Sequence, residues 1–586
     1  MRFLARENRR ASNRAEGRFK ILMIFFALLF AIMIFRLFYL QILQYGFYSL
    51  YASDQHELAA KLQPTRGQIL VCDKADGALH PLATNRLTWQ VYASPKDMDD
   101  PVSVAHALSS VLQVPDADIV VKLTRDPEDP YELIAKGVDS EAVKALKEQS
   151  LPGVGFLQSS SRLYPEKNIG GQLIGFVAYD EHGGLSGRYG IESSLDSLLG
   201  GTPGKLLAEK DAGGRRLAIG QTQIQEAKNG SDVILTIDRT IQFKACELIS
   251  RAVERHNADG GSIVMMDPET GAIIAMCSTP DFDPMEFGKI KNLSELNNPV
   301  TFNAYEPGSV FKAFTMAAGL DLDKISPKTT YIDKGFEEVD DRVIKNAFSG
   351  ARGEQTMTQA LDESLNTATI FVQQLIGKEQ FRKYMKSFGF GEKTGIELSP
   401  EVKGNISSLE KKGNVFAATA SFGQGIAVTP LQLLAAYTAL ANGGRLFKPY
   451  IVDEIVNPDG TREKTRPELL AQPISKRTSR LITGMLTSAV ENGHGKNAGV
   501  PGFWVAGKTG TAQVARTDGV VGYQTDATIG SFVGFAPAYD PKFVMLVKID
   551  MPRDSQWAEA SAAPLFGEMA KFMFTYLEIQ PDRLTN

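Results

Sequence analysis

Three short clusters of this chain contain residue types suited to acyl transfer through a serine. They read Ser309-Val-Phe-Lys312, Ser364-Leu-Asn366 and Lys508-Thr-Gly-Thr511. Together they contain a hydroxyl nucleophile, amines that can accept and return its proton, and groups that can bind an acyl substrate. Each pattern is too short to be diagnostic by itself, so the sequence around it must decide whether it is functional.

The first cluster opens an apolar helix predicted over 310–320, directly after Pro307-Gly308. Ser309 therefore lies near a helix N-terminus, where free N–H groups favour developing negative charge. Lys312 falls one turn later on the same face, and apolar neighbours would lower its pKa toward that of a general base. The alternative is a serine cap with a lysine that reaches solvent. Ser408-Leu-Glu-Lys411 repeats the pattern in a polar, loop-like stretch and serves as an internal decoy.

The second cluster, Ser364-Leu-Asn366, begins another predicted helical stretch 55 residues after Ser309. The Ser364 hydroxyl could relay a proton, and the Asn366 amide could hold Lys312 or a substrate carbonyl. A helix cap with an exposed asparagine is the alternative interpretation.

The third cluster lies inside a strand predicted over 503–514. On an edge strand, Lys508 and the neighbouring hydroxyls could bind a substrate carboxylate, and a glycine would allow close approach to the backbone. A second Lys-Thr-Gly, at 393–395, lies in a predicted turn and is interpreted as structural. The predicted substrate-binding residues are Thr509, Gly510 and Thr511.

The elements that position these clusters form one predicted α+β domain over 232–578, because strands at both ends of this region can join one sheet around the intervening helices. The predicted strands are 262–267, 272–278, 503–514, 528–537 and 542–550. The predicted helices are 239–256 with Asp238 as N-cap, 310–320, 358–376, 379–387, 415–420, 430–442, 476–491 and 558–577.

An earlier region, 52–230, is rich in glycine and short strands and contains no catalytic constellation, so we interpret it as a structural pedestal. It includes a predicted hairpin over 66–85. Short helices are predicted over 102–113, 139–149 and 189–205.

The N-terminus predicts a membrane anchor. Residues 1–20 carry seven basic and two acidic side chains, and an apolar stretch follows over 21–43 that Arg36 interrupts. About 20 apolar residues span a bilayer, and positive charge stays on the cytoplasmic side. We therefore expect a retained single-pass signal anchor in the cell (inner) membrane, a cytoplasmic tail over 1–20, and an extracytoplasmic catalytic domain. A cleaved signal peptide or a buried core helix fits the flanking sequence less well.

Composition argues against a nucleic-acid-binding protein, a metalloprotein and a disulfide-rich protein. The chain has 586 residues and a formal charge of −5, and nothing in it suggests nucleic-acid binding. The six histidines have no metal-ligand spacing, so no metal and no cofactor are expected. Cys72, Cys246 and Cys277 are odd in number and widely spaced, which predicts a buried or incidental role rather than a disulfide framework.

The three clusters in this order resemble the penicillin-binding protein and serine β-lactamase superfamily. Longer stretches resemble class B penicillin-binding proteins, and the FtsI-type division proteins among them. These stretches are RGQIL (66–70), SRLYPEKNIGGQLIGFVAYDEHGGLSGRYGIE (161–192), LTIDRTIQ (235–242), YEPGSVFKAFTMAAGLD (305–321), SFGQGIAVTPLQLLAAYTALANGG (421–444) and VAGKTGTAQV (505–514).

The resemblance implies a pedestal of the dimerisation type and a D,D-transpeptidase that crosslinks peptidoglycan stem peptides in septal wall synthesis and is inhibited by β-lactams. It implies Ser309 as nucleophile, Lys312 as its base, Ser364 as proton relay and Asn366 as a substrate-orienting group, with Lys508 supporting the relay. The backbone N–H groups of Ser309 and Thr511 would form the oxyanion hole. A SEDS-type glycosyltransferase and other division proteins are implied as partners.

Two alternatives remain open. A D,D-carboxypeptidase or β-lactamase-like hydrolase would use the same acyl-enzyme and resolve it with water. A non-catalytic scaffold or β-lactam sensor would instead assemble a wall-synthesis complex. One departure from related proteins is also visible. They often have a Gly-Thr-Gly turn before the Lys-Thr-Gly strand, whereas residues 492–496 here read Asn-Gly-His-Gly-Lys.

Overall fold

The computed structural model contains two compact units, one formed by residues 1–64 and 202–228 and the other by 65–201 and 229–586. The predicted domain boundaries at 52–230 and 232–578 remain predictions. The predicted cytoplasmic tail over 1–20 lies outside the described residues. The structure describes residues 22–44, 57–62, 64–167, 169–179, 184–209, 222–348, 350–516 and 522–583.

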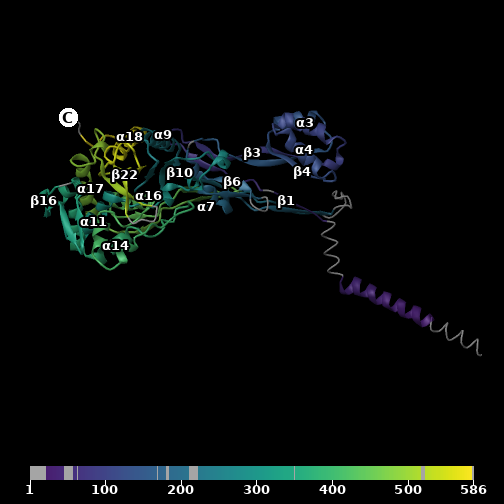
Figure 1. Cartoon of the computed structure of the whole chain (residues 1–586), viewed down its shortest axis with the longest axis horizontal. Helices are drawn as coiled ribbons and strands as arrows, with labels where there is room; N and C mark the ends of the chain where they lie inside the picture. The colour runs from purple at the N-terminus through teal and green to yellow at the C-terminus, as the bar shows by residue number, and fades with distance from the viewer. Residues whose placement is uncertain are drawn as a thin grey trace, which may run out of the picture. The chain divides into compact units, whose positions relative to one another are not determined.

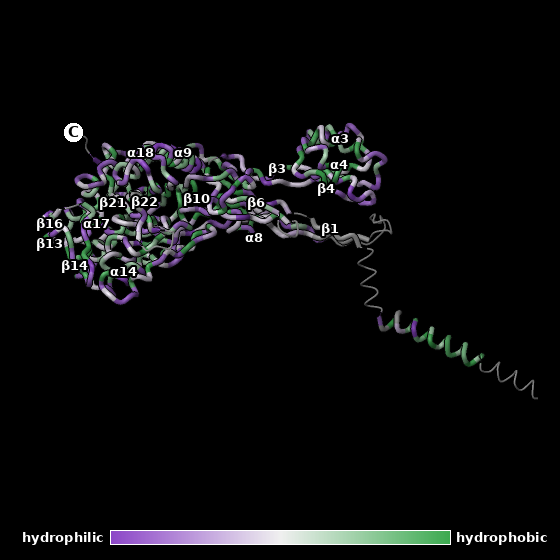
Figure 2. The backbone as a smooth tube through the Cα atoms, viewed as in Figure 1, coloured by the Kyte–Doolittle hydropathy of each residue, from purple (hydrophilic) through white to green (hydrophobic). Residues whose placement is uncertain are grey.

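The first unit contains an N-terminal helix and a small sheet. Residues 22–38 are α-helical, and Tyr39–Leu43 continue as a π-helix. Figure 2 colours much of this helix as hydrophobic. No helix in the described part of the chain meets both the length and the apolarity that a membrane crossing requires. The sheet is antiparallel with the order β1 (Glu57–Leu62), β8 (Gly204–Glu209) and β9 (Thr222–Gln225).

The second unit begins with a mixed sheet that joins the pedestal sequence to later strands. The hairpin predicted over 66–85 is confirmed as β2 (Ile69–Cys72) and β3 (Leu79–Ala93). The sheet order is β19-β18-β10-β2-β3-β4, and β5 also pairs with β3. The other bounds are β4 (Glu132–Val138), β5 (Val154–Leu163), β10 (Asp232–Asp238), β18 (Val452–Val456) and β19 (Arg462–Lys464).

Three helices pack on one end of this sheet around a separate apolar cluster (Figure 1). The helices α3 (Pro101–Leu112) and α5 (Ser140–Glu148) match the predictions over 102–113 and 139–149. The sequence reasoning missed α4 (Asp116–Arg125), which starts only four residues after α3 ends. The single helix predicted over 189–205 is wrong, because Leu195 interrupts it with φ −112° and leaves two short helices, α7 (Gly190–Ser194) and α8 (Asp196–Leu199).

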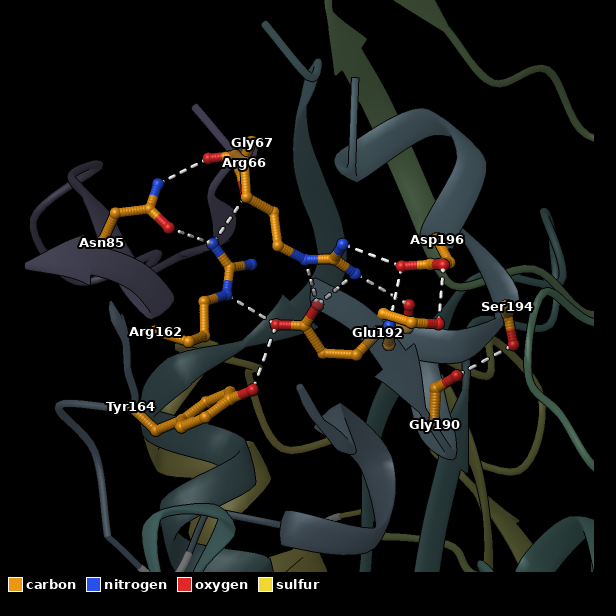
Figure 3. Close-up of polar contacts among 11 residues, drawn as sticks. Arg66, Gly67, Asn85, Arg162, Tyr164, Gly190, Glu192, Ser194 and Asp196 are labelled. Carbon is orange, nitrogen blue, oxygen red and sulfur yellow. Dashed lines mark hydrogen bonds and ion pairs between the residues drawn. The ribbon is translucent and has the colours of Figure 1, made fainter. Parts of the chain in front are cut away.

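A buried ionic network ties together two of the stretches quoted above, 66–70 and 161–192 (Figure 3). Glu192 is fully buried and accepts hydrogen bonds from Arg66 Nε at 2.8 Å and Arg162 Nε at 2.6 Å. The Tyr164 hydroxyl donates to the same carboxylate at 3.3 Å, and Arg66 also pairs with Asp196 at 2.7 Å. Because buried charges must be paired to be tolerated, this network fixes how the two stretches meet.

The three clusters lie on or beside a five-stranded sheet with the order β12-β11-β23-β22-β21. The predicted joining of both ends of the domain in one sheet is confirmed, since β11 pairs with β23 along its whole length. The strands are β11 (Gly260–Met266), β12 (Ile273–Thr279), β21 (Ala506–Ala515), β22 (Tyr523–Ala536) and β23 (Phe543–Asp550).

The central strands of this sheet are buried on both faces. Side chains alternate between faces along a strand, so Ile263 and Met265 of β11 join one core with α9 (Arg239–Arg255) and α18 (Ala562–Tyr576). Val264 and Met266 join the other core with the remaining helices. Figure 1 shows α9 and α18 together, apart from α11 and α14. The other helices are α11 (Lys312–Asp321), α12 (Met357–Asp362), α13 (Asn366–Ile376), α14 (Lys378–Ser387), α15 (Val415–Ala420), α16 (Pro430–Ala441) and α17 (Lys476–Glu491).

The cysteine prediction is partly wrong. Cys246 and Cys277 are buried, as expected, but they form a disulfide between α9 and β12. Their Cα atoms lie 5.3 Å apart although 31 residues separate them in the chain, because α9 packs against the strand that carries Cys277. Spacing in the sequence could not show this proximity. Cys72 is the free cysteine of the described residues.

Candidate active site

Ser309 lies in a single 3-10 turn, Gly308–Phe311, that runs directly into α11. The prediction of a helix start at this serine is therefore confirmed within one turn. Lys312 is the first residue of α11 and is only 1% exposed. Burial, followed by the positive charge of Lys508, lowers the pKa of Lys312 well below its ordinary value. Burial disfavours the charged form of an amine, so a larger fraction of it is neutral and able to accept a proton.

Ser364 lies between α12 and α13 and adopts a left-handed backbone with φ +54°. Lys312 Nζ donates to the Ser364 carbonyl oxygen at 2.5 Å and to its Oγ at 3.2 Å. A non-glycine residue held in this conformation stores strain that the surrounding structure must offset, which is common at functional sites. The structure thus joins the first two clusters through the lysine amine.

Asn366 begins α13, and its Nδ2 donates to the Lys345 carbonyl at 2.9 Å. It is absent from the described residues that line the pocket around Ser309. In this structure its amide therefore secures the strand β15 (Arg342–Lys345). Its predicted substrate-orienting role stays a prediction.

The third cluster lies on β21, which is the edge strand of the five-stranded sheet, as the sequence predicts. Lys508 is 2% exposed, and its Nζ donates to Thr509 Oγ1 and to the Thr509 carbonyl, both at 3.2 Å. Burial lowers the pKa of Lys508 to about 8, although the negative charges of Asp362 and Glu559 oppose this shift. Lys508 is therefore still mostly cationic at neutral pH.

Steric contacts explain why position 510 is a glycine, and the sequence did not reveal them. A Cβ at this position would lie 2.9 Å from the Pro307 carbonyl oxygen and equally close to Val310 Cγ1 and Ser531 Oγ. The space beside the glycine is therefore taken by the turn that carries Ser309. Only glycine lets β21 approach the nucleophile turn this closely.

A pocket with an empty volume of about 400 Å³ brings the three clusters together. Ser309, Ser364, Thr509 and Thr511 all line it. Side chains that the sequence reasoning did not select complete the wall, and they are Phe348, His494, Trp557 and Glu559. The only sequence signal for any of them is the unusual Asn-Gly-His-Gly-Lys segment, which contains His494.

Asp362 is a further group that sequence reasoning missed. It is 8% exposed at the end of α12, and burial raises its pKa to about 6. Ser488 Oγ donates to its Oδ2 at 2.9 Å. Its charge interacts with Lys508, so the ionised carboxylate helps to keep that lysine protonated. An isolated aspartate at a helix end has no sequence signal that would reveal this role.

Neither decoy takes part in the pocket. Ser408 lies in a separate 3-10 turn, Ser407–Glu410. The second Lys-Thr-Gly forms a turn, in which Thr394 donates from its N and Oγ1 to Glu401 Oε1 at 2.7 and 2.6 Å. The structure therefore keeps both decoys away from the pocket that Ser309 and Thr509 line, and the catalytic roles of the selected copies stay predictions.

Comparison with known families decides the class of protein. Residues 261–571 match the penicillin-binding protein transpeptidase domain, and residues 61–235 match the penicillin-binding protein dimerisation domain. The chain belongs to the penicillin-binding protein family. Its two matched regions give it the domain pair of a class B penicillin-binding protein, with an α+β fold.

Relatives of this penicillin-binding protein cover most of its length. Stage V sporulation protein D of Bacillus subtilis is 34% identical over 95% of this chain and 86% of its own. The probable peptidoglycan D,D-transpeptidase PenA of Neisseria gonorrhoeae is 28% identical over 97% of this chain and 94% of its own. The peptidoglycan D,D-transpeptidase FtsI of Buchnera aphidicola is 30% identical over 82% of this chain and 81% of its own.

Solved structures agree with this penicillin-binding protein in fold. Penicillin-binding protein 2X from Streptococcus thermophilus superposes with a TM-score of 0.73 and 25% identity, over 89% of this chain and 81% of its own. Penicillin-binding protein 3 from Mycobacterium tuberculosis, solved with aztreonam, gives a TM-score of 0.69 and 25% identity over 89% of this chain and 98% of its own.

Proposed function

We propose that this protein is a peptidoglycan D,D-transpeptidase that crosslinks stem peptides through an acyl-enzyme on Ser309. The observation that carries the proposal is the buried amine of Lys312. It lies one turn from Ser309, its pKa is lowered, and it bonds to Ser364 Oγ at 3.2 Å. A buried amine of lowered pKa, one turn from the serine nucleophile and bonded to a second hydroxyl, is suited to acyl transfer.

In the first half-reaction Lys312 takes the proton of Ser309 Oγ as this oxygen attacks the carbonyl carbon of the penultimate D-Ala. The backbone N–H groups of Ser309 and Thr511 hold the developing oxyanion. The C–N bond then breaks, and the proton returns through Ser364 to the leaving amine of the terminal D-Ala. Lys508 and the hydroxyls of Thr509 and Thr511 hold the substrate carboxylate during this step.

In the second half-reaction an amine of a neighbouring stem peptide attacks the ester carbonyl. The new C–N bond forms as the bond to Ser309 Oγ breaks, and the serine oxygen regains a proton through Lys312. A β-lactam would enter the same path at Ser309 and remain there as a stable ester. Penicillin-binding protein 3 of Mycobacterium tuberculosis has been solved in complex with aztreonam and with ampicillin.

A labelled penicillin tests the first half-reaction. The wild type is expected to bind it covalently at Ser309, located by mass spectrometry of the adduct, and Ser309→Ala is expected to bind none. Ser408→Ala, which changes the decoy serine, is the matched control and should label normally. Label that persists in Ser309→Ala would refute the assignment.

A stem-peptide donor with and without an amine acceptor tests the second half-reaction. Crosslinked product is expected whenever acceptor is present. If only hydrolysis occurs with the acceptor in excess, the protein is a carboxypeptidase or β-lactamase-like hydrolase. If the wild type forms no acyl-enzyme at all, the scaffold or sensor interpretation holds.

The same proposal includes a retained anchor over 21–43 in the cell membrane, with the catalytic domain on the extracytoplasmic side. The basic residues of 1–20 and the apolar, exposed side chains of the helix over 22–38 support it. The Cys246–Cys277 disulfide is also consistent with an oxidising compartment outside the cytoplasm. The full chain should sediment with membranes, and external protease should digest it in spheroplasts. A full chain that stays in the soluble fraction would contradict the anchor.

The proposed cellular role is septal wall synthesis, together with a SEDS-type glycosyltransferase and other division proteins. Relatives named for peptidoglycan transpeptidation and for sporulation support this role. Purification of the full chain in mild detergent should recover the glycosyltransferase partner, and removal of residues 1–44 should abolish the recovery. Equal recovery with and without that segment would show that the anchor does not mediate the contact.

A further inference from the structure

Four side chains on one wall of the pocket have no part in the reaction steps above. His494 Nδ1 lies 2.8 Å from Glu559 Oε2. The Phe348 ring stacks on the His494 ring, with centroids 5.1 Å apart and an interplanar angle of 16°. Phe348 also stacks on Trp557 at 4.7 Å and 28°. We call these four residues the rim cluster, and all of them line the pocket that contains Ser309.

The rim cluster is held against the substrate-binding strand. The Ala558 N–H donates to Thr511 Oγ1 at 3.1 Å, which places the segment that carries Trp557 and Glu559 directly beside the Lys-Thr-Gly-Thr strand. Asn497 Nδ2 donates to the Glu559 carbonyl at 2.7 Å and ties in the segment that carries His494. The carboxylate of Glu559 is also close enough to Lys508 to raise its pKa.

The chemistry of the rim cluster differs from that of the carboxylate-binding strand. A carboxylate only accepts hydrogen bonds, so the Glu559 contact places the proton of the neutral imidazole on Nδ1 and leaves the lone pair on Nε2. A carboxylate that fixes the tautomer of a histidine in this way prepares it to act as a base. A negative charge and stacked aromatic faces also attract a cation rather than an anion.

An acyl-enzyme at this site must be resolved by an amine that is an ammonium ion in water. We propose that the rim cluster is the binding subsite for the acceptor amine and that His494 removes the proton that makes it unreactive. This inference rests on the proposed transpeptidase function. Glu559 attracts the ammonium and positions His494, and the rings of Phe348 and Trp557 line its approach.

The proton balance is complete. The acceptor ammonium gives one proton to His494 Nε2 and becomes a neutral amine. That amine attacks the ester carbon, the C–N bond forms, and the bond to Ser309 Oγ breaks. The second proton of the amine passes to Lys312 and then to Ser309 Oγ. His494 returns the first proton to solvent, to which its partly exposed side chain has access.

A purely structural clamp between two loops is the competing explanation, and His494→Gln separates the two. Glutamine can still donate a hydrogen bond to Glu559, but it cannot act as a base. The matched control is His256→Gln. His256 forms an equivalent contact with Asp554 at 2.9 Å but does not line the pocket.

The experiment uses the full chain, a thioester donor that acylates Ser309, and a D-amino acid as acceptor. We expect His494→Gln to lower the ratio of aminolysis to hydrolysis at least about 10-fold, since general base catalysis contributes that much or more. Its rate of acylation by labelled penicillin should stay within about twofold of the wild type, because acylation needs no acceptor. Glu559→Gln should raise the KM for the acceptor, and His256→Gln should change none of these quantities.

An unchanged partition ratio in His494→Gln would overturn the inference and favour the clamp. A fall in penicillin acylation parallel to the fall in aminolysis would also overturn it, because the pocket as a whole would then be distorted. Failure of the proposed function is a different result, since the wild type would then form no acyl-enzyme at Ser309.

Discussion

The buried network at Glu192 makes a prediction about stability that the structure quantifies. Glu192→Gln keeps the size of the side chain but places an NH₂ group where a carboxylate oxygen now faces guanidinium donors. Arg162 then loses its ionic partner at 2.6 Å, while Arg66 retains Asp196 at 2.7 Å. Removing one partner of a buried ion pair costs about 3–5 kcal/mol, because the other charge stays buried without compensation. We expect a loss of this size in the free energy of unfolding.

Urea unfolding followed by circular dichroism measures the loss. Glu410→Gln is the matched control, because Glu410 forms an exposed pair with Lys386 at 3.2 Å and surface pairs contribute little. Arg162→Met should also destabilise strongly, and the double variant Arg162→Met/Glu192→Gln should lose less than the sum of the two single losses. A loss in Glu192→Gln no larger than in Glu410→Gln would refute the reasoning that this network determines the local fold.

Three further predictions concern the site and its support. Penicillin acylation should decline above pH 8, where Lys508 loses its charge. Asp362→Asn should move this decline to lower pH, because it removes a negative charge that raises the pKa of Lys508. A pH–rate profile of acylation tests this, and a profile that Asp362→Asn leaves unshifted would contradict it. Gly510→Ala should slow acylation at least about 10-fold, because the added Cβ pushes β21 away from the Ser309 turn. Stopped-flow measurements test this. Equal acylation rates in the variant and the wild type would show that the turn moves to accommodate the Cβ without loss of activity. Cys246→Ser should cost about 3–4 kcal/mol of unfolding free energy relative to the oxidised wild type, because the disulfide closes a loop of 31 residues. An unfolding free energy equal to that of the oxidised wild type would exclude a structural role for the disulfide.

The sequence predicted most of the transpeptidase fold because its elements have strong local signals. Apolar helical runs such as 430–442 and strand runs such as 542–550 appear in the structure within a residue or two as α16 and β23. Prediction failed where local signals are weak. The helix over 189–205 breaks at Leu195, and α4 is short and follows α3 almost directly.

The residues of the candidate site also fall into two groups, those with a local pattern in the sequence and those without one. Ser309, Lys312 and Lys508 could be preferred to their decoys from the sequence, because an apolar helix start and a terminal strand are visible there. Asp362 and Glu559 were missed, because an isolated acidic residue has no local pattern. Each acts on Lys508 through space, and only the folded chain brings it there.

The sequence by itself determined which residues are candidates for acyl transfer and which copies of each motif lie in a helix start, a strand or a turn. Hydroxyl, amine and helix propensity are properties of the residues and their neighbours, so they can be recognised along the chain. Only the tertiary structure decided how those residues act on one another. It buried both lysines, so that desolvation lowers the pKa of each, the charge of Lys508 lowers the pKa of Lys312 further, and Asp362 and Glu559 oppose the shift at Lys508. It also placed His494 beside Glu559 and joined Cys246 to Cys277, because distances between segments far apart in the chain are set by packing and not by spacing in the sequence.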